Sequence, residues 1–252
     1  MSRETTGSGV QSIDRAVLLL ELLGDAGGSM RLAELVTATG LPLPTVHRLI
    51  RSLTDNGYVR QEASRRYALG PRLIRLGEAS SRGLGSVAMP HLTALASQIG
   101  ETANMAVLDG DEVLYVAQVP SAHSMRMFTE VGRRVAAHST GVGKALLSLL
   151  PDPLVSQLLH RTGMASRTPE TITDPELMLR ELADIRRQGW AVDRAEQEIG
   201  VWCVAAPLVD APARVAISVS GPSGRISAER LADIAPVVQE FARALAQDLH
   251  SD

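Results

Sequence analysis

A glycine-rich turn in the second half of the chain is the first segment whose residue types could do chemistry. Residues 139–144 read Ser-Thr-Gly-Val-Gly-Lys, which is close to a phosphate-binding loop. That loop needs a glycine five residues before its Gly-Lys glycine and a hydroxyl residue after the lysine, but His138 and Ala145 stand there. Nucleotide hydrolysis is therefore excluded. A glycine turn that opens a helix still presents unpaired N–H groups, so Gly141 and Val142 form either a carboxylate cradle or a turn required for tight packing.

The single cysteine, Cys203, is the second candidate. As a nucleophile it would need a base, and although His138 is available, no local signature joins the two residues. A lone cysteine in an apolar strand is more often a small buried residue. Ser218 and Ser220 share one face of another predicted strand, and with Asp193 they and the thiol could line a small polar pocket. The alternative is that these are sheet residues whose polar groups are satisfied by the backbone.

Arginine is concentrated in the first third of the chain. Residues 1–77 carry ten arginines against seven acidic residues, a charge of +3. Residues 78–252 carry fifteen basic and twenty-one acidic residues, a charge of −6, and the two parts give the overall −3. Within residues 44–72 the charge is +4, because Arg48, Arg51, Arg60, Arg65, Arg66 and Arg72 are opposed only by Asp55 and Glu62. The acidic average therefore does not argue against binding to nucleic acid.

Helical periodicity and turn residues place these arginines on a small set of elements. An apolar stripe from Ile13 to Leu23 predicts a first helix, and residues 32–39 predict a second that ends at Gly40. Residues 45–56 predict a third helix, opened by Pro44. Residues 58–69 predict two short strands joined by a polar turn. Helix, helix, tight turn, helix and basic hairpin is the order of a winged helix-turn-helix.

The polar side of the third predicted helix would enter the major groove of double-stranded DNA. Arg48 would fork onto guanine, its helical neighbours would reach base edges or phosphate, and the arginines of the hairpin tip would meet phosphate or the minor groove. The residues expected at DNA are Thr45, His47, Arg48, Arg51, Arg65 and Arg66. The alternative is a small helical subdomain with a solvated basic face. The element order, the glycine-terminated second helix and the placement of the arginines together favour DNA.

The remaining sequence predicts a linker helix and an α+β domain. Residues 71–99 predict one long helix or two, with Pro90 starting or kinking the second piece. Beyond Gly100, strands are expected at residues 102–108, 113–119, 125–131, 190–192, 202–209 and 215–220. Helices are expected at residues 142–150, 154–159 and 175–188, and from Ser227 to about residue 249. Strands joined mostly as antiparallel pairs, with helices to one side, indicate an α+β sensor-like domain.

Composition excludes several classes of protein. The chain has 252 residues, of which 45% are hydrophobic and 21% charged, as is typical of globular proteins. No apolar run approaches the ~20 residues of a membrane span, and the N-terminus lacks the apolar core of a signal peptide. One cysteine excludes an intramolecular disulfide and a multi-cysteine zinc site. We expect a soluble, cytoplasmic protein with no metal, no cofactor and no membrane partner.

Several ordered motifs resemble the IclR family of bacterial transcriptional regulators over nearly the whole chain. In the first part they are Ser12-Ile13-Asp14-Arg15-Ala16, Leu41-Pro42, Thr45-Val46-His47-Arg48-Leu49, Asn56-Gly57-Tyr58-Val59 and Tyr67-Ala68-Leu69-Gly70. In the second part they are Met125-Arg126-Met127, Gly132, His138 to Ala145, Gly189 to Asp193, Cys203 to Pro207 and Ala216 to Pro222. The number and order of these motifs make the resemblance specific.

The resemblance implies a domain order and a ligand. After a disordered tail over residues 1–9, we expect a winged helix-turn-helix domain over 10–70, a linker helix over 71–88 and a GAF-like effector-binding domain over 89–252. The family implies a homodimer formed through the DNA-binding half, often a tetramer, and a small organic acid as effector. In relatives that bind glyoxylate or pyruvate, the ligand lies over the glycine-rich turn. By position this implies Gly141, Val142, Asp193, Cys203, Ser218 and Ser220 as contacts, with Met127 and Val135 as an apolar wall.

One departure from the family concerns the start of the third helix. Many relatives have Lys-Ser or Arg-Ser before the Thr-Val-His-Arg stretch, whereas this chain has Leu43-Pro44, so a phosphate-contacting base and a capping hydroxyl are absent. We interpret the chain as a ligand-responsive repressor of a catabolic operon that binds a pseudo-palindromic operator. Two alternatives stay open: an activator or dual regulator of the same family, and a Cys203-dependent enzyme that acts on a small oxo-acid.

Overall fold

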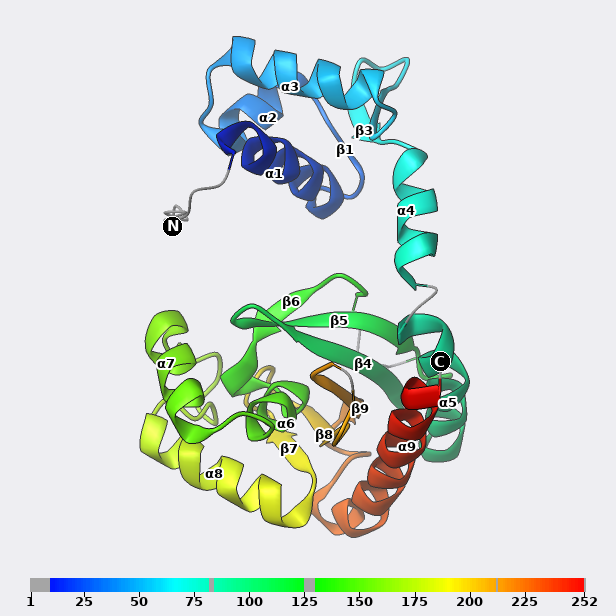
Figure 1. Ribbon diagram of the computed structural model, residues 1–252, viewed down its shortest axis with the longest axis vertical. Coiled ribbons are helices and arrows are strands. Elements are labelled where there is room, and N and C mark those ends of the chain that lie inside the picture. The colour runs from blue at the N-terminus through cyan, green and yellow to red at the C-terminus, as the bar shows by residue number, and fades with distance from the viewer. Residues whose placement is uncertain (1–9, 82–83, 125–129, 212, 252) are drawn as a thin grey trace. The chain divides into compact units, whose positions relative to one another are not determined.

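The structure is a computed structural model that describes residues 10–81, 84–124, 130–211 and 213–251. The chain divides into two units, Met1–Ser80 and Ser81–Asp252, which follow one another along the colour scale of Figure 1. The boundary between the units falls inside the segment expected to form the linker helix. The tail expected at residues 1–9 lies outside the described residues.

Helices and a small antiparallel sheet make up the first unit. The helices are α1 (Gln11–Asp25), α2 (Leu32–Thr39), α3 (Leu43–Asp55) and α4 (Arg72–Ser81), and the strands are β1 (Ser29–Met30), β2 (Val59–Gln61) and β3 (Tyr67–Leu69). The strand order is β1-β3-β2. The predicted helices and basic hairpin are confirmed. Strand β1 was not predicted, because a two-residue strand is too short to show a period.

The helices of the first unit share an apolar core. Its buried residues are Leu19, Leu23, Leu35, Val46, Ile50 and Val59. Helix α2 ends at Gly40, whose left-handed backbone (φ 66°) lets its N–H donate to the Val36 carbonyl oxygen at 3.0 Å. This glycine closes α2 as the sequence predicts and leaves a tight turn before α3.

Helix α3 begins at Leu43, earlier than the predicted start at Thr45. The carbonyl oxygen of Pro42 accepts hydrogen bonds from the N–H groups of Thr45 (2.9 Å) and Val46 (3.1 Å), so the first turn already includes Pro44. Proline is tolerated there because the N–H groups of a first turn have no partner within the helix. Pro42 stands at the N-cap and supplies no side-chain cap.

Helix α5 (Leu84–Ile99) opens the second unit and contains Pro90 in its interior. Of the two roles expected for Pro90, starting this helix is wrong, and its interior position is the one at which a kink was expected. Ala88, Leu92 and Leu95 are buried on both sides of the proline. Their packing continues the helix, since burial of an apolar face offsets the one backbone hydrogen bond that proline cannot make.

An antiparallel sheet with strand order β6-β5-β4-β9-β8-β7 forms the centre of the second unit. Its strands are β4 (Thr102–Asp109), β5 (Glu112–Val119), β6 (Arg134–Ala136), β7 (Ala191–Arg194), β8 (Val201–Pro207) and β9 (Val215–Pro222). Strand β4 pairs with β9, so the hairpin β4–β5 lies beside strands that follow it by about a hundred residues along the chain. The α+β class predicted from the sequence is confirmed.

Helices cover both faces of this sheet. Helix α5 and the C-terminal α9 (Leu231–Ser251) pack on one face, and α6 (Gly141–Ser148), α7 (Asp152–Thr162) and α8 (Pro175–Gln188) lie on the other, which we call the α6 face (Figure 1). Neighbouring residues of β8 separate accordingly, because Val204 packs under α9 and Ala205 packs under α6. The expectation of helices on one side is wrong, since a sheet with two apolar faces must be covered on both.

Two further boundaries in the second unit differ from the sequence predictions. Most of the strand expected at residues 125–131 lies outside the described residues, and β6 follows it, leading into a short 3₁₀ turn η1 (Ala137–Ser139). The last helix begins at Leu231 after a 3₁₀ turn η2 (Ala228–Arg230), and the hydroxyl of Ser227 makes no capping hydrogen bond. Within the described ranges, no helix is long and apolar enough to cross a membrane.

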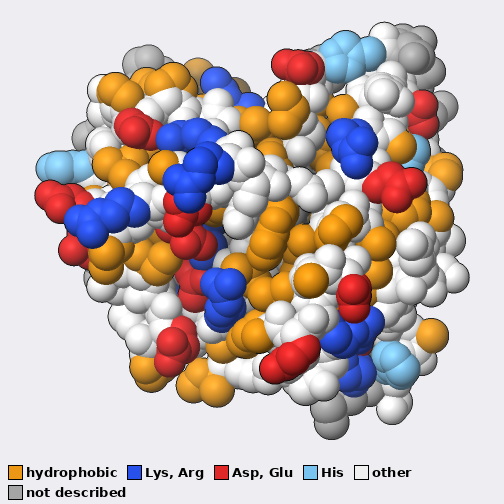
Figure 2. Space-filling view, turned by 90° about the horizontal axis from the view of Figure 1, so that it is seen from below, with side chains coloured by type: hydrophobic (Ala, Val, Ile, Leu, Met, Phe, Trp, Pro, Cys, Tyr) orange, Lys and Arg blue, Asp and Glu red, His pale blue; other side chains and the backbone are white. Residues whose placement is uncertain are grey.

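Basic and acidic side chains are intermixed on the face of the molecule that Figure 2 shows. Ion pairs made by α8 follow the same pattern, since Arg186 lies 2.8 Å from Asp152 and Arg187 lies 2.6 Å from Asp184. A surface of mixed sign offers no continuous positive track to a phosphate backbone. Such a face lacks the charge distribution that a DNA-binding surface requires.

Candidate functional site

The side of α3 that faces away from the core carries the residues expected at DNA. His47, Arg48 and Arg51 are exposed there, and Thr45 is half-buried in the first turn. Arg48 has no ion-pair partner among the described residues, whereas Arg51 Nε lies 3.9 Å from Asp55. The guanidinium of Arg48 is therefore available for a contact outside the protein.

The hairpin separates the two arginines that were expected at its tip. Arg65 is exposed in the turn, with a left-handed backbone (φ 60°). Arg66 turns back into the unit, where its Nη2 donates to the Ser29 carbonyl oxygen at 2.8 Å and lies 3.3 Å from Glu34 Oε2. These bonds tie the hairpin to β1 and α2. The guanidinium of Arg66 is thus occupied within the unit, and Arg65 is the exposed one of the pair.

The glycine-rich turn forms the N-terminus of α6. Thr140 is the N-cap residue, and its Oγ1 accepts a hydrogen bond from the N–H of Gly143 at 3.2 Å. A Cβ atom on Gly141 would lie 2.9 Å from Cys203 Sγ, and one on Gly143 would lie 2.2 Å from a backbone carbonyl oxygen. Both glycines are therefore required for tight packing. The same approach lets the N–H of Val142 donate toward the Cys203 thiol.

Cross-strand pairing gathers the residues of the predicted polar pocket on the α6 face. Cys203 of β8 pairs with Ser220 of β9 and with Asp193 of β7, and Ser218 lies two residues back along β9. All four side chains are buried. The cluster, as we call these four residues, combines a thiol, two hydroxyls and a carboxyl at the N-terminus of α6. The side chains that strand alternation placed on one face do lie together.

One hydroxyl of the cluster has no backbone partner and only the Cys203 thiol beside it. Ser218 is fully buried, and its Oγ makes no hydrogen bond of standard geometry with any described residue. A buried hydroxyl in this state costs about 1–3 kcal/mol of stability. For Ser218 the backbone does not satisfy the hydroxyl, so Ser218 can bond a polar group that enters from outside.

The thiol of the cluster is not an activated nucleophile. Burial raises the pKa of Cys203 to about 11, the charge of Asp193 acts in the same direction, and the nearby serine hydroxyls lower it only in part. The thiol is therefore protonated at neutral pH. His138, the base considered for it, has its Nε2 3.1 Å from the Ala165 carbonyl oxygen, and burial lowers its pKa. The geometry gives no support to a Cys203-dependent enzyme.

The carboxyl of Asp193 is held in an uncommon state. Burial raises its pKa to about 7, and the charge of Glu196 adds to the rise, while N–H groups of the following loop and the charge of Lys144 lower it. The closest of these contacts joins the Glu196 nitrogen to Asp193 Oδ1 at 2.6 Å. At neutral pH a large share of molecules carries a protonated Asp193. In that state the carboxyl does not repel an anion.

This raised pKa predicts a pH dependence of stability. Because an unfolded aspartate has a pKa of about 3.9, the folded protein binds this proton more tightly. The stability from this group is complete below about pH 4 and is lost as the pH rises through about 7. We expect Asp193→Asn to lack that loss. The difference in unfolding free energy between Asp193→Asn and the wild type should therefore shift by about 2–3 kcal/mol in favour of the variant from pH 5 to pH 8.

Urea unfolding of both proteins at the two pH values measures this difference. Asp233→Asn, which changes an exposed carboxyl of α9, is the matched control and should follow the wild type. If the unfolding free energies of the wild type and Asp193→Asn changed with pH in the same way, the pKa of Asp193 would not be raised and the prediction would be wrong.

A buried ion network beside the cluster was not predicted. Lys144 of α6 is fully buried, and its Nζ lies 2.5 Å from Glu196 Oε1 and 3.1 Å from Glu181 Oε1. In the sequence this lysine stands out only as the last residue of a turn that fails the phosphate-loop pattern. Its position in the first turns of a buried helix was the available signal. Because two glutamates neutralise Lys144, an anion in the cluster must be held by N–H groups and hydroxyls instead.

Two amide residues of the α6 face were also missed. Asn104 of β4 pairs with Gln118 of β5 and with Ser218 of β9. Gln118 Nε2 donates to Asn104 Oδ1 at 3.1 Å, and Asn104 Nδ2 donates to Ser220 Oγ at 3.4 Å. The signal that could have found them is the polar residue at alternate positions, Thr102 and Asn104, at the start of an otherwise apolar strand.

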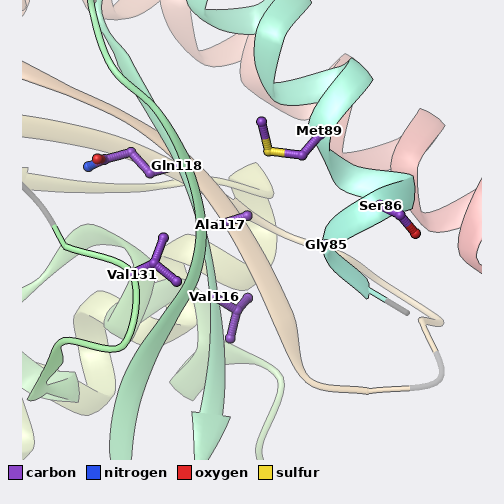
Figure 3. Close-up of a pocket in the computed structure, with 7 residues that line it drawn as sticks. All are labelled: Gly85, Ser86, Met89, Val116, Ala117, Gln118 and Val131. Carbon is purple, nitrogen blue, oxygen red and sulfur yellow. The ribbon is translucent and has the colours of Figure 1, made fainter. Parts of the chain in front are cut away.

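The two residues expected as an apolar wall have different outcomes. Val135 of β6 is buried in the core of the α6 face, and Met127 lies outside the described residues. A pocket of about 270 Å³ opens between α5 and β5, and its lining includes Met89 and Gln118 (Figure 3). Gln118 therefore belongs both to a surface pocket and to the hydrogen-bonded chain that reaches the cluster.

The first unit is a winged helix unit with an exposed, arginine-bearing helix, and the second unit encloses a polar cluster. This combination defines a DNA-binding regulator that responds to a ligand. Comparison with known proteins leads to the same class. Residues 77–247 match the model of the bacterial transcriptional regulator IclR C-terminal domain, and residues 12–63 match the IclR helix-turn-helix domain. The chain belongs to the IclR family of bacterial transcriptional regulators, as its motifs indicated.

Individual relatives agree over most of the chain. The transcriptional repressor IclR of Escherichia coli K12 is 36% identical over 241 residues, covering 93% of this chain and 88% of the relative. The acetate operon repressor of Salmonella typhimurium is 35% identical over the same shares of the two chains. The crystal structure of an IclR transcriptional regulator from Alicyclobacillus acidocaldarius is 27% identical, with a TM-score of 0.86 over 96% of this chain and 99% of that one.

These relatives are transcriptional regulators and not enzymes. This chain is likewise a transcriptional regulator. The two relatives that are named as repressors support repression as the mode of regulation of this protein. The alternative of a Cys203-dependent enzyme is thereby removed.

Proposed function

We propose that this protein represses a catabolic operon by binding a pseudo-palindromic operator, and that a small organic acid bound in the second unit relieves the repression. Two relatives are repressors by name, and one of them is named for an acetate operon. An acid can act as a signal only if it binds one geometry of the oligomer more tightly than another. The oligomer in this proposal is a homodimer that pairs further into a dimer of dimers.

The DNA contacts in this proposal come from α3 and the hairpin tip. Arg48 reads a base edge, Thr45 and His47 contact base edges or phosphate, and Arg51 and Arg65 contact phosphate. The structure supports this division through exposure, since Arg48 and Arg65 are exposed, while Arg66 is occupied by Ser29 and Glu34. We therefore propose Arg66 as the residue that positions the hairpin.

The homodimer in this proposal forms through the outer side of α1. Val10, Ile13 and Val17 recur at helical spacing there, with exposed fractions of 62%, 59% and 49%. A row of apolar side chains on a surface helix indicates a protein interface. Two copies joined through this helix would present two α3 helices to successive major grooves, which matches a pseudo-palindromic operator.

The observation that carries the effector site is the unpartnered hydroxyl of Ser218 at the N-terminus of α6. Helix N-termini favour anions, because their N–H groups and dipole point outward. The N–H of Val142 faces the Cys203 thiol, and Ser220 stands opposite Cys203 across the sheet. A carboxylate placed among these groups accepts hydrogen bonds from Val142 and from both serine hydroxyls.

The surroundings of the cluster set the kind of acid. Lys144 is neutralised by Glu181 and Glu196, so the site suits one carboxylate rather than several. A protonated Asp193 can donate a hydrogen bond to a second oxygen of the ligand. Neighbouring strands lie about 4.8 Å apart, so an acid that spans β8 and β9 has about two to four carbon atoms. Glyoxylate and pyruvate fit this description.

Ser218→Ala tests the proposed site. We expect its affinity for glyoxylate or pyruvate to fall about tenfold, because one hydrogen bond to the carboxylate is lost. Its stability should stay the same or rise by up to about 1 kcal/mol, because the hydroxyl has no partner to lose. Release of an operator, selected by this protein from a random-sequence pool, can be followed by fluorescence anisotropy during titration with each acid.

Ser148→Ala is the matched control. Its hydroxyl is also buried in the second unit, but it donates to the Ala145 carbonyl oxygen at 2.6 Å. This variant should lose stability and keep the response to the acid, the reverse of Ser218→Ala. A Ser218→Ala protein that releases the operator at wild-type acid concentrations would place the effector elsewhere.

A further inference from the structure

We propose that the side-chain amide of Asn104, held in place by Gln118, selects among effectors by donating a hydrogen bond to an oxygen on the carbon next to the carboxylate. This inference rests on the proposed effector site. It adds to that site the residue that distinguishes a 2-oxo or 2-hydroxy acid from an unsubstituted acid of the same length.

Asn104 lies in the middle of the α6 face, beside the cluster. The register of the sheet places it opposite Ser218 on β9 and opposite Gln118 on β5. Residues that stand opposite each other in an antiparallel pair project from the same face, with Cβ atoms about 4.5–5.5 Å apart. The amide of Asn104 is therefore a direct neighbour of the unpartnered Ser218 hydroxyl.

Two hydrogen bonds set the orientation of this amide. Its Oδ1 accepts from Gln118 Nε2 at 3.1 Å, so its nitrogen points the other way, where Nδ2 donates to Ser220 Oγ at 3.4 Å. An amide nitrogen carries two N–H groups, and the bond to Ser220 uses one of them. The other can donate to a ligand oxygen that lies between Asn104 and the two serines.

Gln118 acts as a positioning residue for Asn104. Figure 3 shows Gln118 and Ala117 leaving β5 on opposite sides, with Ala117 on the side of Met89 and α5. Gln118 therefore extends over the α6 face, where its amide reaches Asn104. Gln118 stands on β5, one strand further from β9 than Asn104, so it holds the buried amide from the edge of the proposed site.

The burial of Asn104 argues for a role beyond packing. Its side chain is fully buried, and its chain neighbours Ala103 and Met105 already supply the apolar core on the opposite face. A buried amide is unfavourable unless its hydrogen bonds are made, and an apolar residue would fill the space without that requirement. When a carboxylate is held at Val142 and Ser218, a substituent directed toward β4 meets the N–H groups of Asn104.

Binding of paired acids to the full-length protein tests this inference. Calorimetric titration with pyruvate and propionate, and with glyoxylate and acetate, gives the preference for the 2-oxo acid within each pair. We expect the wild type to prefer the oxo acid and Asn104→Leu to lose about tenfold of that preference, with the affinity for the plain acid unchanged. Gln118→Met should lose part of the preference. Gln239→Met, which removes an amide of α9 that donates to the Gln188 carbonyl oxygen of α8, should lose none.

The outcomes separate this inference from the proposed function. An unchanged preference in Asn104→Leu overturns the inference and leaves the effector site in place. A wild-type protein that binds none of the four acids overturns both. If Asn104→Leu does not fold, Gln118→Met decides the matter, because a reduced preference supports the role of the amide and an unchanged one overturns it.

Discussion

Replacing Arg48 with alanine is expected to lower operator affinity by at least about 100-fold without loss of stability. A bidentate contact between arginine and guanine contributes about 1–3 kcal/mol of discrimination, and a homodimer makes this contact in both half-sites. Arg48 is exposed on α3 and has no ion pair with any described residue, so its removal should not change the thermal unfolding curve. Fluorescence anisotropy with the selected operator measures the loss of affinity.

Arg51→Ala is the matched control for Arg48. It lies on the same side of α3, one turn further from the N-terminus, and is paired with Asp55. As a phosphate contact, Arg51 should contribute equally to operator and to unrelated DNA, and its loss should reduce the salt dependence of binding. If Arg48→Ala also weakened both DNAs equally, Arg48 would be a phosphate contact and the base-reading role would be wrong.

If the protein is the homodimer proposed above, Val17→Asp is expected to convert it into monomers and to lower operator affinity by at least about 100-fold. Val17 lies in the exposed apolar row of α1, where a carboxylate would have to be buried without a partner. A monomer binds one half-site and loses the second, intramolecular binding event that a dimer gains. Sedimentation velocity gives the mass, and anisotropy gives the affinity.

Leu177→Asp controls for the charge. Leu177 of α8 is 50% exposed, which matches the 49% of Val17, but it lies in the second unit. This variant should keep the mass and the operator affinity of the wild type. A Val17→Asp protein that stays dimeric would place the dimer interface on another surface.

Elements with strong end signals could be predicted residue by residue. Helix α8 runs from Pro175 to Gln188 as expected, because proline is favoured in a first turn and Gly189 ends the helix with a left-handed backbone (φ 78°). Elements without such signals were mispredicted. Strands β1 and β6 have two and three residues, and their positions depend on the longer strands with which they pair.

The candidate site could be predicted only in part. Alternation along β9 was sufficient to place Ser218 and Ser220 on one face, and the glycines at the start of α6 marked its N-terminus. Asn104, Gln118 and Lys144 were missed because their partners come from other strands and helices. Arg66 was assigned to DNA because charge and position are visible in the sequence, whereas its bonds to Ser29 and Glu34 are not.

The local order of helices and strands, the separation of a basic unit from an acidic one, and the family could all be inferred from the sequence. These follow from periodicity, turn residues and charge, which act over a few residues. Which polar groups meet depends on how the strands pair in the folded chain. Cys203 stands between Asp193 and Ser220 because the consecutive strands β7, β8 and β9 pair in one register. Asn104 meets Ser218 because β4, which is far away in the chain, pairs with β9. Burial of apolar residues on both faces of the sheet selects these registers.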